Sequence, residues 1–201
     1  MRAPSARVLY WAATLGGAVP GLWLWWQYQT GALGVVPDEV LLHQTGRFGL
    51  TFLMGTLAIG FAHFLTGWGV LFAARRPLGV WAFAYALSHA LIWGWFDQGG
   101  TLAFMRMEIA EMRHVQLGLA ALVLMAPLAL SSFNAAQRMM TLRRWKWLHQ
   151  LTWPTAALAV FHAWSVARFE APLVTAMGAA LALMMLTRLF TLAQGRRAGP
   201  R

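Results

Sequence analysis

Residues 143–164 read RRWKWLHQLTWPTAALAVFHAW, a basic segment followed by an apolar run that carries two histidines, His149 and His162, on either side of Pro154. An apolar run of this length suits a lipid bilayer, in which titratable side chains are rare and usually functional. The presence of two imidazoles in such a run therefore requires an explanation. The stretch predicts a membrane-spanning helix that also carries chemistry.

The composition of the whole chain is typical of a membrane protein. Of its 201 residues, 59% are hydrophobic and 11% are charged, against about 45–50% and about 25% in soluble domains. The absence of cysteine excludes disulfides, iron–sulfur ligation, cysteine-based zinc sites and covalent C-x-x-C-H heme attachment. The net charge is +10, but the charges fall between apolar runs, which indicates membrane topology rather than nucleic-acid binding.

Six apolar runs are each near or above the roughly 20 residues that a helix needs to cross a bilayer. They cover residues 8–28, 48–73, 79–96, 114–134, 147–167 and 171–193. Their length and the absence of period-2 alternation predict helices rather than a β-barrel. The expected fold is an all-α membrane protein, a single domain over residues 1–201 that forms a bundle of six transmembrane helices.

The distribution of charge between the runs predicts the orientation of the bundle. The N-terminus, the second and fourth connections and the C-terminal end together hold twelve of the sixteen basic residues and no acidic residue. The other three connections hold all six acids: Asp38, Glu39, Asp97, Glu108, Glu111 and Glu170. Because connections rich in Lys and Arg face the cytoplasm, both termini are expected there.

Four of the six histidines lie inside apolar runs: His63, His89, His149 and His162. At a rise of about 1.5 Å per residue they fall at two depths in the membrane. His89 and His162 lie toward the outer surface, whereas His63 and His149 lie toward the cytoplasm. His89 can therefore meet His162 at the outer level, and His149 can meet His63 at the inner level.

Facing imidazoles on neighbouring helices are typical of a heme iron clamped from both sides, which leaves no open position for a substrate. Zinc normally takes a third protein ligand, often a carboxylate, and proton relays commonly place Asp or Glu in the membrane. No acidic residue lies within these runs. The pattern favours heme and electron transfer.

One point of geometry leaves two possibilities open. His149 and His162 are thirteen residues apart, which puts them about 140° apart around an ideal helix. Either Pro154 changes the phase by kinking the helix, or each ring has its own partner.

Two kinds of supporting residue are expected around a heme. A ligating imidazole usually donates its second N–H to an acceptor, and Ser88, Thr152 and Ser165 are near neighbours in sequence. Heme propionates need cations at the membrane surfaces, and the arginines at the ends of the apolar runs either supply these cations or only set the topology. The candidates for propionate or surface contacts are His43, Arg47, Arg75, Arg76, Arg143 and Arg144.

Four segments carry a resemblance to a known family. They are HQTGRFGLTFLMGTLAI at 43–59, RRPLGVWAFAYALSHAL at 75–91, RRWKWLHQLTW at 143–153 and AVFHAW at 159–164. Together they resemble MsrQ, also called YedZ, the heme-binding membrane subunit of the periplasmic protein-methionine-sulfoxide reductase system, within the ferric-reductase-like transmembrane group. The resemblance runs from the first apolar run through the sixth.

The resemblance implies a b-type cytochrome of the bacterial inner membrane, with one or two hemes and an associated FMN. The family's heme histidines correspond to His89, His149 and His162. His63 lies in GFAHFLTGWG, where the family commonly has a Thr-Pro-x-Arg-like segment. It is therefore either a ligand at the inner level or a packing residue.

The resemblance also implies partners. Electrons would come from quinol or a cytoplasmic flavin reductase and leave for a periplasmic molybdopterin subunit similar to MsrP, which reduces methionine sulfoxide in oxidised proteins. The chain would then be an electron-transfer subunit rather than the catalytic reductase.

Two alternatives stay open. One is an autonomous transmembrane ferric or quinone reductase, and the other is a small transporter or assembly factor without a redox role. Only QGRRAGPR follows the sixth run and the outer connections are short, which favours the electron conduit.

Overall fold

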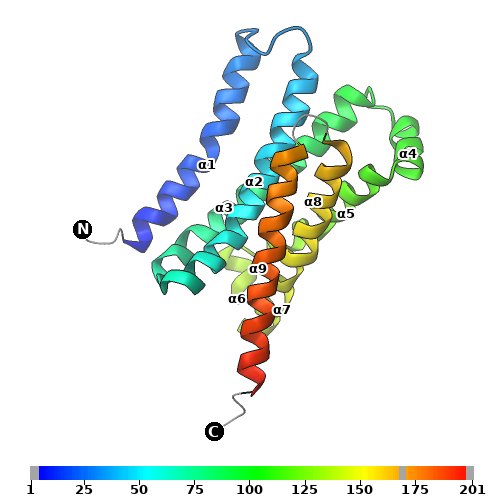
Figure 1. The fold of residues 1–201 in the computed structure, drawn as a ribbon. Coiled ribbons are helices and arrows are strands. Elements are labelled where there is room, and N and C mark those ends of the chain that lie inside the picture. Colours follow the sequence, from blue (N-terminus) through cyan, green and yellow to red (C-terminus); the bar gives the residue numbers. More distant parts are fainter. Residues whose placement is uncertain (1–4, 168–170, 198–201) are drawn as a thin grey trace.

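The computed structural model describes residues 5–167 and 171–197, and within these ranges the chain is helical and contains no strand (Figure 1). The long helices are α1 (Ala6–Gln29), α2 (Pro37–Thr66), α3 (Phe72–Ile92), α5 (Arg113–Leu130), α8 (Thr152–Val166) and α9 (Ala171–Arg197). The all-α prediction is confirmed. Arg2, Glu170 and Arg201, on which the predicted topology partly rests, lie outside the described residues.

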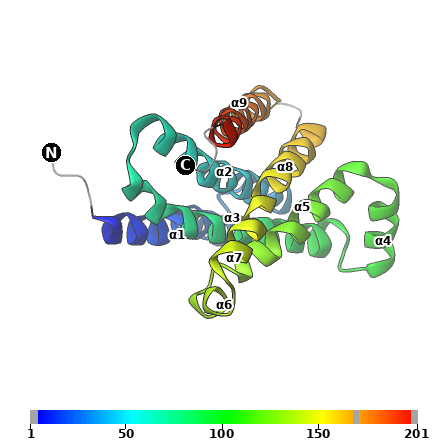
Figure 2. The ribbon, with the colours of Figure 1, turned by 90° about the horizontal axis from the view of Figure 1, so that it is seen from below.

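Short helical segments connect the long helices. They are η1 (Gly69–Leu71), the π-helical turn η2 (Trp93–Asp97), α4 (Leu102–Glu111), α6 (Asn134–Arg138), α7 (Leu142–Leu148) and η3 (His149–Leu151). The sequence did not predict α4, which packs on α5 at one edge of the molecule (Figures 1 and 2).

Three of the long helices are long and apolar enough to cross a membrane, by length and composition. They are α2, α5 and the part of α9 from Ala171 to Ala193. The same criterion does not select α1, α3 or α8, so the crossing of all six helices stays a prediction.

The second helix differs from the expected run 48–73 at both ends. It begins at Pro37, a residue suited to the first helical position, with Asp38 and Glu39 in the first turn, where acidic side chains favour the positive end of the helix dipole. It ends at Thr66 because Gly67 adopts the left-handed conformation, with φ +71°. Hydropathy alone marked neither boundary.

The expected run 147–167 is not one helix. It is divided into α7, the 3₁₀ turn η3 and α8, and His149 is the first residue of the turn. Pro154 lacks the N–H that would bond the carbonyl of Gln150, four residues before it, and the 3₁₀ turn lies just before this gap. His149 and His162 therefore do not share one regular helix.

The helices pack with α3 at the centre. Helix α3 contacts α1, α2 and α5, whereas α9 lies on the far side of α2 and α8 (Figure 2). Gly49 on α2 permits a close approach of α2 and α3, since a Cβ there would lie 3.2 Å from the backbone nitrogen of Ala86 on α3. The buried core combines α2, α3, α5, α8 and α9 and includes Leu57, Ala82, Met125 and Ala156.

The long helices alternate in direction, so the bundle has two ends. The His89 end contains the start of α2, the end of α3, the start of α5 and the end of α8 (Figure 1). The His149 end contains the end of α2, the start of α3, the end of α5 and the start of α8. The start of α1 and the end of α9 lie toward the His149 end (Figure 1).

Candidate functional site

His89 and His162 meet at the His89 end of the bundle. His89 is near the end of α3 and His162 is near the end of α8, and their ring centroids are 5.9 Å apart. The two ring planes make an angle of 72°. Two helices that are distant in sequence thus bring two half-buried imidazoles together, with the edge of one ring toward the other.

Each of these rings donates a hydrogen bond to a backbone carbonyl. His89 Nδ1–H donates to the oxygen of Leu42 at 2.9 Å, and His162 Nδ1–H donates to the oxygen of His114 at 2.7 Å. Because a carbonyl only accepts, both rings must carry their proton on Nδ1. Nε2 of each ring keeps its lone pair and has no hydrogen-bond partner within the described part of the chain.

The prediction of Ser88 and Ser165 as acceptors for His89 and His162 is wrong, because both rings donate to the carbonyls of other helices. The hydroxyls of Ser88, Thr152 and Ser165 donate to backbone carbonyls three or four residues earlier, those of Ala84, His149 and His162, at 2.9, 2.9 and 2.7 Å. A helical hydroxyl finds this carbonyl without any movement of the backbone.

His114 is the residue of this site that the sequence analysis did not select. Its carbonyl accepts from His162, and its ring lies 6.4 Å from the His162 ring, with an angle of 33° between the planes. The sequence could have indicated His114 through its position at the start of α5, at the same end of the bundle as the end of α8. His43 is exposed on the first turns of α2 and pairs with Glu39, with Nε2 and Oε1 3.7 Å apart.

The second candidate, His149, has a different environment. Its Nε2 lies 3.0 Å from the hydroxyl of Ser131, and its ring packs on Trp145 with centroids 4.1 Å apart. Trp145 in turn donates to the carbonyl of Ser131 at 3.2 Å. Arg75 lies within electrostatic range of His149 and of Arg188. The end of α5 thus holds His149 through one buried serine.

The structure does not record the predicted contact between His63 and His149. The ring of His63 packs against Phe72 at 4.7 Å, because Gly67 ends α2 within a turn of His63 and returns the chain to it. Nδ1 of His63 is buried and has no hydrogen-bond partner within the described ranges. Two further atoms of this kind, Trp153 Nε1 and Thr155 Oγ1, lie in the first turn of α8.

Three unpartnered polar atoms in one half of the bundle call for a physical explanation. A buried polar atom without a partner costs about 1–3 kcal/mol, and native proteins contain few of them. All three are on elements that reach the His149 end, whereas the imidazoles at the His89 end are satisfied by carbonyls. The two halves of the bundle therefore differ in how their buried polar atoms are satisfied within the described residues.

Comparisons of the sequence with known proteins show the family of the chain. A family model described as the ferric reductase like transmembrane component matches residues 45–160, more than half of the chain. Three relatives are each named protein-methionine-sulfoxide reductase heme-binding subunit MsrQ. The Ralstonia nicotianae protein is 35% identical over 197 residues, 97% of this chain and 89% of its own length. The Rhodospirillum rubrum protein is 31% identical over 181 residues, 90% and 87% of the two chains. The Xanthomonas oryzae protein is 38% identical over 162 residues, 79% and 74% of the two chains.

The chain belongs to the MsrQ family. It is accordingly a membrane protein of the ferric-reductase-like transmembrane group, as the four quoted segments indicated. The matched range contains His89 and His149 and ends two residues before His162.

The predicted cationic contacts of this MsrQ-family chain lie in different places. Arg76 Nη1 donates to Asn134 Oδ1 at 2.6 Å, which ties the start of α3 to α6. Arg75 is half-buried beside His149. Arg47 is exposed on α2, one turn after His43. Arg75 thus interacts electrostatically with a candidate histidine, His149.

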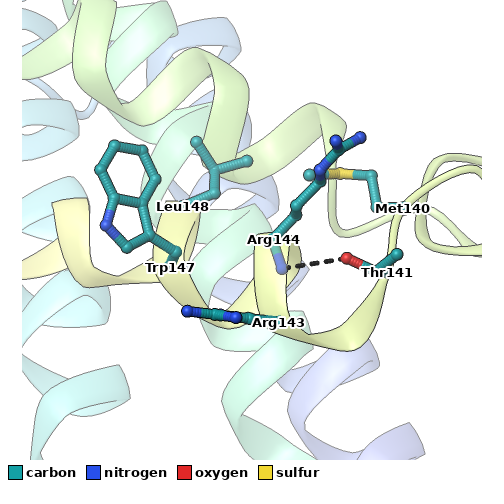
Figure 3. A pocket seen from close by; sticks show the side chains of 6 residues that line it. All are labelled: Met140, Thr141, Arg143, Arg144, Trp147 and Leu148. Atoms are coloured by element: carbon teal, nitrogen blue, oxygen red, sulfur yellow. Dashed lines mark hydrogen bonds between the residues drawn. The ribbon is translucent and has the colours of Figure 1, made fainter.

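Arg143 and Arg144 line a surface hollow of about 500 Å³. Figure 3 shows Arg144 extending beside Met140 and Arg143 beneath Trp147. Both arginines are exposed. The hollow contains no acidic side chain among its lining residues, which are Met140, Thr141, Arg143, Arg144, Trp147 and Leu148.

Proposed function

We propose that this MsrQ-family chain binds a b-type heme between His89 and His162 and uses it to pass electrons across the bacterial inner membrane. The observation that carries the proposal is the pair of imidazoles whose Nδ1 atoms are held by carbonyls and whose Nε2 atoms are available. A heme supplies a reversible one-electron couple when bound.

The spacing of the rings fits one iron between them. An imidazole nitrogen binds a metal at about 2 Å, so rings on opposite faces of one iron have centroids roughly 6 Å apart. The observed separation is 5.9 Å. No group of three His, Asp or Glu side chains that would suit zinc is found within the described residues. Two imidazoles suffice where a porphyrin supplies the other ligands, and they leave no site for a substrate.

The His149 end is proposed to hold a second heme, with His149 as a ligand. The unpartnered atoms of His63, Trp153 and Thr155 support a polar ligand in this half. Arg75, beside His149, is the cation proposed for a propionate. His63 is the candidate for a further ligand, with packing against Phe72 as the alternative.

FMN belongs to the proposal only through the family resemblance. A flavin phosphate would need cations in forked geometry, and the hollow lined by Arg143 and Arg144 offers two guanidinium groups. FMN titration of the purified protein tests this. Affinity for FMN that is unchanged in an Arg143→Gln/Arg144→Gln variant would exclude the hollow.

The orientation and partners complete the proposal. All six long helices cross the membrane, with the His149 end and both termini in the cytoplasm, because the arginine-rich connections lie at that end. Quinol or a cytoplasmic flavin reductase supplies electrons there. A periplasmic molybdopterin subunit similar to MsrP takes them at the His89 end, as the relatives' names imply for methionine-sulfoxide reduction.

A reduced-minus-oxidised absorption spectrum of the purified protein tests this function. We expect a b-type spectrum and reoxidation of the heme when an oxidised MsrP-like subunit is added. Reoxidation by ferric iron or quinone but not by that subunit would favour an autonomous reductase. A folded protein without heme would remove both redox functions and leave a transporter or assembly factor.

A further inference from the structure

Two glycines face the two imidazoles at the His89 end. A Cβ on Gly46 of α2 would lie 3.0 Å from His89 Nδ1 and 3.1 Å from its Cε1. A Cβ on Gly118 of α5 would lie 2.9 Å from His162 Nδ1 and 3.0 Å from its Cε1. For both glycines the three nearest atoms all belong to the histidine ring.

Each glycine comes four residues after the carbonyl that accepts from the same ring. His89 bonds to Leu42, four residues before Gly46, and His162 bonds to His114, four residues before Gly118. In an α-helix the carbonyl of a residue already accepts from the N–H four residues later. A ring reaches the second lone pair of that carbonyl only where the later residue has no side chain in the way. We call each combination of an accepting carbonyl and the glycine four residues after it a carbonyl–glycine seat.

We infer that Gly46 and Gly118 are positioning residues that seat His89 and His162 for heme coordination. The inference rests on the proposed function. Each seat fixes the proton on Nδ1, directs Nε2 away from the supporting helix and sets the plane of the ring. Two independent helices, α2 and α5, use the same device for the two ligands of one iron.

The seats are distinct from the glycines that serve helix packing. A Cβ on Gly49, in the same helix as Gly46, would meet the backbone of α3 at Ala86 and Ala82. A Cβ on Gly60, also in α2, would meet nothing within 4 Å. The glycines of α2 therefore differ in their surroundings. At Gly46 a side chain is excluded by the His89 imidazole and not by the backbone of a neighbouring helix.

The seats also affect the redox chemistry. A hydrogen bond from Nδ1–H to a carbonyl makes the ring more electron-rich, so it donates more strongly through Nε2 and stabilises ferric iron. Loss of either seat is therefore expected to raise the midpoint potential of this heme. It also frees the ring to rotate, which changes the angle of 72° between the two planes.

The test compares Gly46→Ala and Gly118→Ala with Gly60→Ala as the control. Alanine favours a helix more than glycine does, so none of the three changes weakens its own helix. We expect a higher midpoint potential and an altered low-spin electron paramagnetic resonance spectrum, or loss of this heme from folded protein, in the two seat variants. Gly60→Ala should match the wild type.

Folded seat variants with wild-type potential and spectrum would overturn the inference while leaving the proposed function intact. A wild-type protein without heme would instead remove the proposed function. Where a seat variant does not fold, the electron paramagnetic resonance spectrum of the wild-type protein tests the inference instead. Nearly perpendicular ligand planes give a strongly anisotropic low-spin signal, which supports the seats, whereas the rhombic signal of nearly parallel rings contradicts them.

Discussion

At the scale of single residues, the two histidines of the 143–164 stretch are held in different ways. His162 donates to a backbone carbonyl, which only accepts and so fixes the tautomer of the ring. His149 contacts the hydroxyl of Ser131, which can donate or accept. The first contact suits a permanent ligand geometry, and the second leaves the proton of the ring adjustable.

Replacement of Ser131 tests the contact to His149. Ser131 and Ser132 both donate to the carbonyl of Leu128, at 3.2 and 2.8 Å, but only Ser131 also reaches His149. We expect Ser131→Ala to shift the midpoint potential of a heme at the His149 end and Ser132→Ala to leave it unchanged. Equal potentials in both variants, measured by redox titration, would argue against a role for Ser131 in holding this ligand.

Replacement of His63 tests the unpartnered atom. His63→Phe keeps an aromatic ring against Phe72 and removes the buried Nδ1, which has no partner within the described residues. We expect the heme-free protein to become more stable, by about 1 kcal/mol in thermal unfolding, because the unsatisfied atom is gone. Heme content should fall if His63 is a ligand, and wild-type heme content would assign His63 to packing.

At the scale of elements, the break between α7 and α8 separates the environments of the two rings. Residues of a 3₁₀ turn advance about 120° each, against about 100° in an α-helix, so η3 changes the direction of His149 relative to α8. Pro154 lies just after this turn. The second of the two possibilities from the sequence, a separate partner for each ring, is the one the structure shows.

Pro154→Ala is expected to let α8 extend back toward α7 and turn His149 away from Ser131. The cofactor at the His149 end should change its spectrum or be lost, whereas the heme between His89 and His162 should be retained. Redox titration, which resolves cofactors of different potential, measures both. A variant in which both cofactors behave as in the wild type would show that η3 does not depend on proline.

The sequence predicted side-chain pairs better than backbone contacts. Depth along the apolar runs predicted that His89 can meet His162, because rise per residue is nearly constant in a helix. For His63 and His149 the structure shows other neighbours instead, Phe72 for the first ring and Trp145 for the second. The carbonyls of Leu42 and His114 were not predictable, because every residue carries a carbonyl and only packing selects one. The signal that the sequence analysis missed is a glycine four residues after each of these two residues, Gly46 and Gly118.

At the scale of the whole molecule, the alternating helices put two kinds of environment at opposite ends. The His89 end has imidazoles satisfied by carbonyls. The His149 end has unpartnered polar atoms and arginines, including Arg188, which lies 4.9 Å above the Trp153 ring. An electron path from one end to the other fits this asymmetry, with a donor at the arginine-rich end.

The proposed orientation is testable because the natural chain has no cysteine. Single cysteines at Gln98, between η2 and α4, and at Arg138, in α6, lie at opposite ends of the bundle. In intact cells we expect a membrane-impermeant maleimide that reaches the periplasm to label Gln98→Cys, and to label Arg138→Cys only after the inner membrane is permeabilised. The reverse pattern would contradict cytoplasmic termini.

The heme-to-protein ratio of His162→Ala tests the central claim most directly. His114→Ala is the matched control, because His162 uses the backbone carbonyl of His114 and not its ring for the hydrogen bond. We predict that His162→Ala lowers the ratio by one heme per chain in a folded, monodisperse protein, while His114→Ala keeps the wild-type ratio. A wild-type ratio and an unchanged reduced-minus-oxidised spectrum in His162→Ala would contradict a heme held between His89 and His162.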